Sequence, residues 1–266
     1  MATIDRRGFI AALGAAAVPA PAWPSPPQVA RLRTEFKPFT GDFDAMLERR
    51  LIRMICPYSR TLFFRDKGDV YGTAVDGAQT FETWVNKTYK TGARPVTVDL
   101  VPVSRDKLFD ALLDGKGDFA AGDITITPER AKRVAFTMPV INDVKEVLVT
   151  AATVPDMASA DDLSDREVAT KASTTYYLDL QALNARLAAA GRPAVTITLV
   201  PDTLEDEDLM DMVAAGLLPA IVVDDWVARL WGRSLKGSSC IPRRCCAMAP
   251  RSAGRFGRRT RSYWWL

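Results

Sequence analysis

The apolar positions of this chain form short uninterrupted runs, separated by segments in which apolar residues recur every three or four positions. Short runs are typical of strands buried on both faces, and the wider spacing is typical of amphipathic helices. The pattern predicts two successions of strands and helices. In the first, we expect strands at 51–55, 96–101 and 119–121 and helices at 77–89 and 106–113.

The second succession comes after a strand at 145–150 and a stretch rich in proline and aspartate. It contains predicted strands at 167–170, 195–200 and 217–223 and predicted helices at 176–190, 204–214 and 225–231. Such alternation indicates α/β lobes with largely parallel sheets. We expect the first lobe at 38–146, the second at 147–233, and a ligand-binding cleft where their strand ends face each other.

Composition narrows the chemistry that this fold can carry. The 266 residues are 48% hydrophobic and 25% charged, which suffices for two lobes of about 100 residues each. The chain has no histidine, which excludes nucleophile–histidine pairs, histidine-ligated zinc and imidazole proton transfer. Cys56 is the only cysteine before residue 234, so no disulfide framework is expected in the lobes. We predict neither a metal nor a cofactor.

The net charge of +3 conceals an asymmetry along the chain. Residues 234–266 hold eight of the 35 basic residues and no acidic residue, which leaves 27 basic against 32 acidic residues elsewhere, a net −5. The basic character therefore belongs to this segment and does not indicate a nucleic-acid partner. The segment could be a basic functional tail, an irregular folded extension or an out-of-frame translation. Its sudden loss of acids favours the last, in which case the C-terminal part of the fold is incomplete.

Residues 1–22 have the features of an export signal. Arg6 and Arg7 precede a weakly hydrophobic, alanine-rich run of about ten residues, which is too short to span a bilayer. The Arg-Arg-x-Phe pattern resembles a twin-arginine signal, and a disordered basic N-terminus is the alternative. Residues 23–37 are rich in proline and then charged, which is typical of a linker. We therefore predict a periplasmic protein.

Two segments carry a resemblance to a known family. The first is 38–42 (Pro-Phe-Thr-Gly-Asp) with 52–64, and the second is 117–130 (Gly-Asp-Phe-Ala-Ala-Gly-Asp-Ile-Thr-Ile-Thr-Pro-Glu-Arg) with 134–139. Together they resemble family 3 of the periplasmic solute-binding proteins, and more narrowly the solute-binding module of the membrane-bound lytic murein transglycosylase F family. The resemblance covers residues 38–233 and implies a bilobal periplasmic-binding-protein-like fold with a hinge and a cleft.

Arg130 is the first candidate binding residue. Thr127 and Pro128 form a helix start, in which threonine caps the helix and proline takes its first position. Free N–H groups at such a start suit an anion, and a nearby arginine can clamp a carboxylate with two parallel hydrogen bonds. The resemblance implies that Arg130 binds the α-carboxylate of a ligand. The alternative is a surface arginine that pairs with Asp123 or Glu129.

The resemblance assigns further contacts in the first lobe. Asp123 and Thr125 match a short polar segment that supplies hydroxyl and carbonyl contacts. An acid at position 123 departs from the serine or asparagine that is usual there, so it could favour a cationic group or pair with Arg130. Tyr58 and Phe64 are candidates for an apolar wall, although such residues more often pack in a core.

In the second lobe, Ser173 and Thr174 follow a strand and open a helix, so their hydroxyl and N–H groups could face a ligand or simply cap the helix. Asp224 ends an apolar strand, and the resemblance implies that it holds the amino group of the ligand. An amino-acid-like ligand would then be held at both ends, and contacts from both lobes would drive hinge closure.

These features favour an exported binding module for an amino acid, a peptide or a muropeptide. The alternative is a truncated lytic murein transglycosylase F-like protein whose catalytic domain is missing from this chain. Family transglycosylases use a glutamate within a Glu-Ser dipeptide, whereas none of the eight glutamates here precedes a serine. We therefore expect no enzymatic activity from this chain. We expect a monomer, and the candidate partners besides the ligand are an ABC transporter or peptidoglycan.

Overall fold

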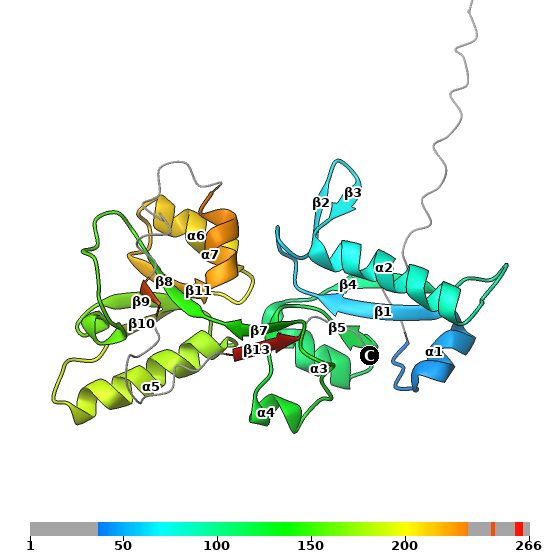
Figure 1. Ribbon diagram of the computed structural model, residues 1–266, viewed down its shortest axis with the longest axis horizontal. Helices are drawn as coiled ribbons and strands as arrows, with labels where there is room; N and C mark the ends of the chain where they lie inside the picture. Colours follow the sequence, from blue (N-terminus) through cyan, green and yellow to red (C-terminus); the bar gives the residue numbers. More distant parts are fainter. Residues whose placement is uncertain (1–36, 234–245, 248–258, 263–266) are drawn as a thin grey trace, which may run out of the picture. The chain divides into compact units, whose positions relative to one another are not determined.

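The structure, a computed structural model, describes residues 37–233, 246–247 and 259–262. The predicted export signal, almost all of the linker and most of the basic segment lie outside the described residues. The two larger groups of elements in the described residues are each built on one sheet with helices packed against it. We call each of these sheets together with its helices a lobe (Figure 1). The predicted boundary between the lobes at 146/147 stays a prediction, and the chain passes between the two sheets through β7 (Ile141–Val144) and β8 (Glu146–Thr150).

The first lobe is built on a parallel three-stranded sheet. β1 (Leu51–Cys56) lies between β4 (Thr97–Pro102) and β5 (Phe119–Ala120), in the order β4-β1-β5. From Ile52 onward every residue of β1 is buried, because the central strand is covered on both faces. Before β5 the chain of this lobe forms three α-helices and one 3-10 turn: α1 (Phe43–Arg49), α2 (Thr73–Thr88), η1 (Arg105–Lys107) and α3 (Leu108–Leu113).

Short elements that the hydrophobic pattern did not predict complete this lobe. β2 (Phe64–Asp66) and β3 (Asp69–Tyr71) form a hairpin of mostly exposed residues. β6 (Ile124–Thr125) and α4 (Pro128–Ala131) follow β5. The helix start predicted at Thr127 is confirmed, since its side-chain oxygen accepts a hydrogen bond from the backbone N–H of Arg130 at 3.2 Å.

The second lobe has a five-stranded sheet in the order β10-β9-β11-β8-β12. Its parallel strands are β10 (Thr196–Leu199), β9 (Glu167–Thr170) and β11 (Ala220–Asp224), and β8 runs antiparallel to β11. Four helical elements join these strands: η2 (Ala160–Leu163), α5 (Thr175–Ala189), α6 (Asp206–Ala214) and α7 (Asp225–Trp231). Each strand and helix that the sequence predicted between 145 and 231 is present, with boundaries shifted by up to three residues.

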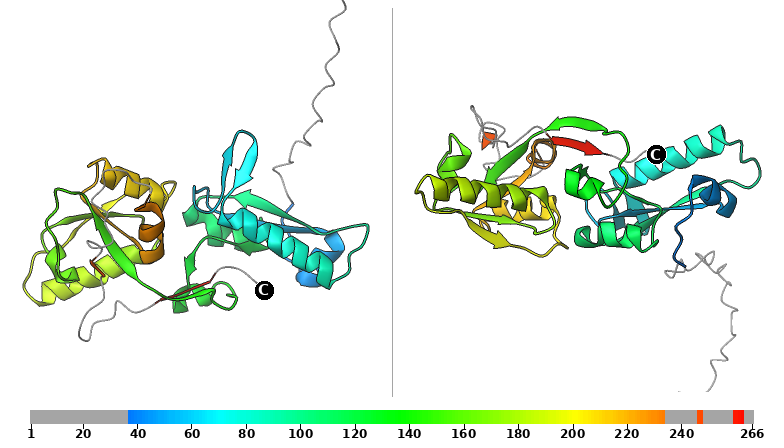
Figure 2. Two further views of the ribbon diagram at one scale, coloured as in Figure 1. Left: turned by 45° about the horizontal axis from the view of Figure 1, so that its top comes forward. Right: turned by 90° about the horizontal axis from the view of Figure 1, so that it is seen from below.

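Alternate residues of β11 pack in two different hydrophobic clusters, one on each face of the second sheet. Ala220 and Val222 pack with Leu180, Leu183 and Leu187 of α5. Their neighbours Ile221 and Val223 pack with residues of α6 and α7 on the opposite face, as the two-residue period of a strand requires. Two further views show α5 on one side of the sheet and α6 and α7 on the other (Figure 2). An uninterrupted apolar strand thus reflects a sheet covered by helices on both faces.

Two short strands come from the basic segment, which had no strand periodicity. β12 (Cys246–Ala247) pairs with β8 and extends the second sheet. β13 (Arg259–Ser262) pairs with both β6 and β7 in a separate three-stranded sheet. Such pairing uses the backbone groups along strands that are already formed, so it does not need an alternating side-chain pattern.

Cys56 lies in the hydrophobic core of the first lobe, and this position predicts how its thiol reacts. Burial raises the pKa of its thiol to about 12, so the reactive thiolate is scarce at ordinary pH. In the folded chain at pH 8 we expect iodoacetamide to leave Cys56 unmodified, and in guanidinium chloride to modify it rapidly. Mass spectrometry of the Cys56 peptide measures this. Equal modification rates in the folded and unfolded chain would contradict the buried position.

Candidate functional site

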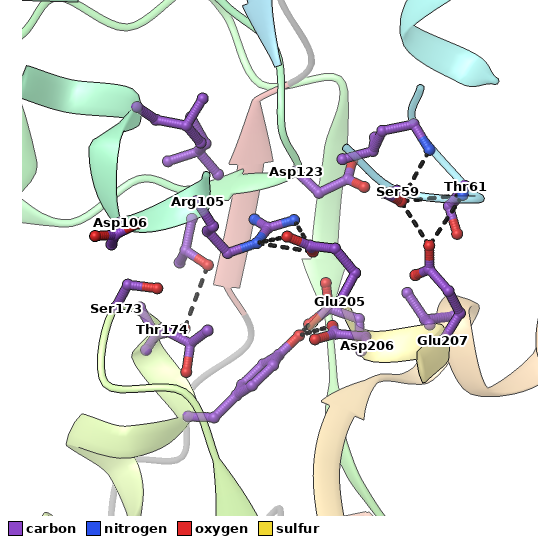
Figure 3. Close-up of a pocket in the computed structure, with 18 of the residues that line it drawn as sticks. Ser59, Thr61, Arg105, Asp106, Asp123, Ser173, Thr174, Glu205, Asp206 and Glu207 are labelled. Atoms are coloured by element: carbon purple, nitrogen blue, oxygen red, sulfur yellow. Dashed lines mark hydrogen bonds and ion pairs between the residues drawn. The ribbon is translucent and has the colours of Figure 1, made fainter. Parts of the chain in front are cut away.

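A polar cavity of about 260 Å³ is lined by residues of both lobes (Figure 3). The first lobe contributes residues from the loop after β1, η1, α3, β6 and α4. The second contributes residues from the N-terminal ends of α5, α6 and α7. The charged and hydroxyl-bearing residues among them are Ser59, Thr61, Arg105, Asp106, Asp123, Thr125, Arg130, Arg133, Ser173, Thr174, Thr175, Tyr176, Glu205, Asp206, Glu207 and Asp224.

Arg130 lines the cavity and connects the two lobes. Its Nη1 donates to the carbonyl oxygen of Thr125 at 3.0 Å, and its Nη2 donates to the carbonyl oxygen of Ser173 at 2.9 Å. The guanidinium carbon lies 5.5 Å from the ring centroid of Phe109. These contacts hold a planar cation with several donors against the wall of the cavity, where its hydrogen bonds to the carbonyl oxygens of Thr125 and Ser173 join residues of both lobes.

Asp224 lines the same cavity from the second lobe. It is the last residue of β11, and only 1% of its surface is exposed. The hydroxyl of Tyr176 donates to its Oδ1 at 3.0 Å, and the indole N–H of Trp226 donates to its Oδ2 at 3.3 Å. Neutral donors from two helices therefore fix the orientation of this buried carboxylate, and the structure brings it to the cavity that Arg130 lines.

Asp123 and Thr125 also line the cavity, and both are buried. Asp123 has a φ of 51°, a left-handed conformation that aspartate tolerates better than most residues. The hydroxyl oxygen of Thr125 lies 3.4 Å from that of Thr175, a residue of the second lobe. In turn the Thr175 hydroxyl donates to Glu146 at 3.1 Å.

Ser173 and Thr174 lie on the cavity wall, where local contacts use both hydroxyl groups. The Ser173 hydroxyl donates to Asp202, and the Thr174 hydroxyl donates to the carbonyl oxygen of Lys171 at 2.9 Å. Thr174 occupies the N-cap position of α5 without a side-chain capping bond. Their hydroxyls therefore shape the loop before α5, and the carbonyl of Ser173 reaches Arg130.

Two of the expected residues do not line this cavity. Tyr58 is 57% exposed, packs edge-on against Phe63 and borders a different depression beside Ser104 and Asp202. Phe64 belongs to β2 and stacks on Tyr71 across the hairpin, with ring centroids 5.5 Å apart. The pairing of β2 with β3 commits Phe64 to this hairpin contact, so these two rings do not form a shared wall of the cavity.

An ion pair at the cavity joins the two lobes, and it was not predicted from the sequence. Arg105 donates from Nε and Nη2 to the Glu205 carboxylate, with a shortest distance of 2.7 Å. Burial alone would lower the pKa of the Arg105 guanidinium, but the nearby carboxylates of Glu205, Asp206 and Asp123 raise it above its ordinary value. The pair joins residues 100 positions apart, so no local motif reveals it. The only sequence signal is the run of four acids from Glu205 to Asp208.

A second unpredicted contact lies beside this pair. Glu207 is 3% exposed and accepts hydrogen bonds from the Ser59 hydroxyl at 2.6 Å and the Thr61 backbone N–H at 3.1 Å. The Thr61 hydroxyl accepts a bond from the indole N–H of Trp231 at 2.9 Å. The loop after β1 is therefore held by α6 and α7 of the other lobe.

The described residues also bear on metal binding and on membrane insertion. No group of three or more cysteine, aspartate and glutamate residues is placed there to hold a metal ion. None of the described helices has the length and apolar character that a membrane crossing needs.

Solved structures of other proteins have folds similar to that of this chain. The described fold is similar to holo ArgBP from T. maritima, with a TM-score of 0.61 and 19% identity over 82% of this chain and 84% of that one. It is also similar to the ancestral amino acid-binding protein AncCDT-1, a precursor of cyclohexadienyl dehydratase, with a TM-score of 0.59 and 23% identity over 72% and 77% of the chains. At these identities the likeness establishes the bilobal fold.

A curated relative is the membrane-bound lytic murein transglycosylase F of Maricaulis maris, which is 36% identical over 83 residues. The match spans 31% of this chain and 18% of that protein. The family model for bacterial extracellular solute-binding proteins, family 3, matches residues 55–223, which include most strands of the two sheets and most of the cavity wall. The family expected from the two sequence segments is thereby confirmed, and the chain belongs to the bacterial extracellular solute-binding proteins of family 3.

Proposed function

We propose that this chain binds a small zwitterionic ligand, an amino acid or a peptide or muropeptide fragment with free amino and carboxyl groups, in the cavity between its lobes. Arg130 takes the carboxylate, and Asp224 takes the ammonium group. The observation that carries the proposal is that a guanidinium from one lobe and a buried carboxylate from the other line one small cavity.

The chemistry of the two groups supports this assignment. An arginine presents parallel donors that match a carboxylate, and the fixed orientation of Asp224 preorganises an acceptor for an ammonium group. Further polar groups on the cavity wall come from Asp123, Thr125, Ser173 and Thr174. Solved neighbours include an ancestral arginine-binding protein bound to arginine, with a TM-score of 0.55, which is consistent with a ligand of this class.

We further infer that the chain binds without catalysing, and that it acts outside the cytoplasm. The family is described as extracellular, and the sequence contains no Glu-Ser dipeptide of the transglycosylase type. Export through the twin-arginine route, and delivery of the ligand to an ABC transporter or to a peptidoglycan-processing partner, belong to this proposal.

Titration calorimetry with blocked ligands tests the proposed function. We expect at least one L-amino acid or short peptide to bind the full chain with a dissociation constant of roughly 1 μM, about −8 kcal/mol. The amide of that ligand lacks the carboxylate, and its N-acetyl derivative lacks the ammonium group. Each should bind at least tenfold more weakly, because a charged partner is lost. Undiminished binding of both blocked forms, or no binding across the panel, would contradict recognition at two ends.

A further inference from the structure

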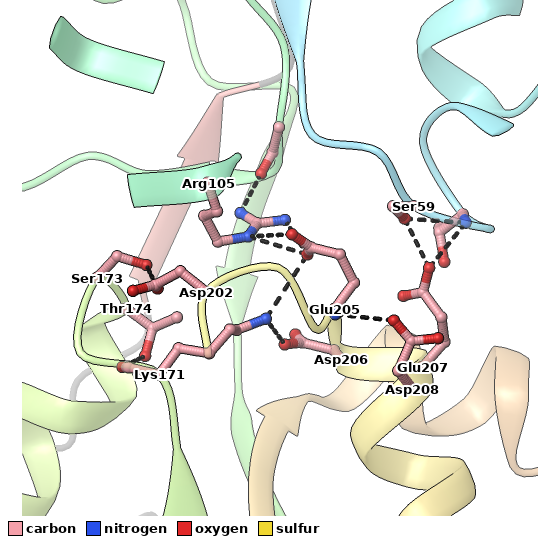
Figure 4. A network of polar contacts seen from close by, with 12 residues as sticks. Ser59, Arg105, Lys171, Ser173, Thr174, Asp202, Glu205, Asp206, Glu207 and Asp208 are labelled. Atoms are coloured by element: carbon pink, nitrogen blue, oxygen red, sulfur yellow. Dashed lines mark hydrogen bonds and ion pairs between the residues drawn. The ribbon is translucent and has the colours of Figure 1, made fainter. Parts of the chain in front are cut away.

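The contacts between the lobes include a buried polar network that needs no ligand (Figure 4). Its centre is the Arg105–Glu205 ion pair, whose side chains are 16% and 3% exposed. Glu207 adds the bonds to Ser59 and Thr61. Ion pairs on open surfaces contribute little because water screens them, whereas a largely desolvated pair with two parallel hydrogen bonds contributes more.

Each half of the ion pair is fixed within its own lobe. In the first lobe, Nη1 of Arg105 donates to the carbonyl oxygen of Gly122 at 2.6 Å. In the second lobe, the buried ammonium of Lys171 lies 2.7 Å from Asp206 and 3.6 Å from Glu205. Asp208 accepts a hydrogen bond from the backbone N–H of Glu205 at 3.0 Å and fixes the start of α6. Because both partners are preorganised, little side-chain entropy is lost when they meet.

We propose that Arg105, Glu205 and Glu207 form an interlobe latch that keeps the lobes together without a ligand, so that they act as positioning residues. The apparent affinity of a ligand that binds only the closed form is its intrinsic affinity multiplied by the fraction of closed molecules. The latch raises that fraction. It therefore strengthens binding of every ligand by a common factor without selecting among them.

The indole N–H of Trp231 reports on the latch, because it donates to the Thr61 hydroxyl across the same boundary. The hydrogen exchange of this indole N–H is followed by NMR in the ligand-free full chain. The signal is assigned as the one that is absent from the spectrum of Trp231→Phe. Glu205→Gln keeps the shape and removes the charge, and we expect it to accelerate this exchange about tenfold. Arg105→Gln should give the same result, and the double variant should add little, because one interaction is lost in all three.

Arg186→Gln is the matched control. It breaks an ion pair with Asp161 that lies within the second lobe and is half-exposed. We expect its Trp231 exchange to equal that of the unmodified chain. Unchanged exchange in Glu205→Gln, or equal acceleration in Glu205→Gln and Arg186→Gln, would overturn the latch.

The affinity effect rests on the proposed function, whereas the exchange measurement uses no ligand. If no ligand of the panel binds, the proposed function is rejected. The exchange measurement still tests the latch in that case. With a bound amino acid, Glu205→Gln should weaken all ligands of the panel by the same factor. A changed order of preference would show that Glu205 contacts the ligand directly, and would overturn its assignment as a positioning residue.

Discussion

Arg130→Ala is expected to weaken binding of a free amino acid by about two orders of magnitude. Removing one partner of a desolvated charge pair costs about 2–5 kcal/mol, because the ligand carboxylate would enter the cavity without its guanidinium. The variant also loses the bonds to Thr125 and Ser173, so part of the effect comes from a weaker contact between the lobes. Calorimetry of the full chain measures the change.

Comparing the free acid with its amide separates these two contributions. The unmodified chain should prefer the free acid, and Arg130→Ala should bind the acid and the amide equally. Arg130→Lys keeps the charge but not the two parallel donors, so its affinity should fall between those of the other two proteins. Arg229→Ala, which removes an exposed guanidinium on α7, should bind normally. An Arg130→Ala protein that still prefers the free acid would contradict the carboxylate assignment.

Apart from β12, the sequence predicted the strands of both sheets well, because helices cover the sheets. Strands buried on two faces, such as 51–56 and 220–224, have continuous apolar runs that stand out from their surroundings. The β2–β3 hairpin was missed because its six residues are almost all exposed and carry no such signal. Its turn uses Lys67 and Gly68, both with positive φ, where only the glycine hinted at a turn.

Six of the eight expected site residues line the cavity, because the residues that the resemblance marks lie at strand ends and helix starts. These are the positions that an α/β fold brings to its cleft. The ion pair between Arg105 and Glu205 escaped prediction for a physical reason. Its partners lie in different lobes, and their meeting depends on how the lobes close rather than on any local pattern.

The Gly117–Asp118 dipeptide illustrates how a specific motif can serve the fold. A Cβ atom at Gly117 would lie 2.5 Å from Cγ2 of Ile55, so the glycine permits the close approach of this segment to β1. The Asp118 side chain is 1% exposed and pairs with Arg53 of β1 and with Arg49. Neither residue lines the cavity. The motif therefore points to the architecture of the first lobe as much as to ligand binding.

Asp118→Ala is accordingly expected to destabilise the chain by about 3–5 kcal/mol, because it leaves a buried arginine without its carboxylate. Asp118 accepts hydrogen bonds from the Arg53 backbone N–H at 2.7 Å, from Arg53 Nη2 at 2.9 Å and from Arg49 Nη2 at 2.6 Å. The Arg53 side chain is itself only 1% exposed. Denaturant unfolding followed by circular dichroism measures the change in the free energy of unfolding.

Two further variants separate the buried charge from ordinary packing. Asp110→Ala removes an exposed partner of Arg133 and should cost less than about 1 kcal/mol. Replacing both members of the buried pair, as Arg53→Met with Asp118→Leu, removes the uncompensated charge and should restore part of the stability lost in Asp118→Ala. If the double variant is less stable than Asp118→Ala, the loss comes from the shape of the site and not from the buried charge of Arg53, and the electrostatic explanation is wrong.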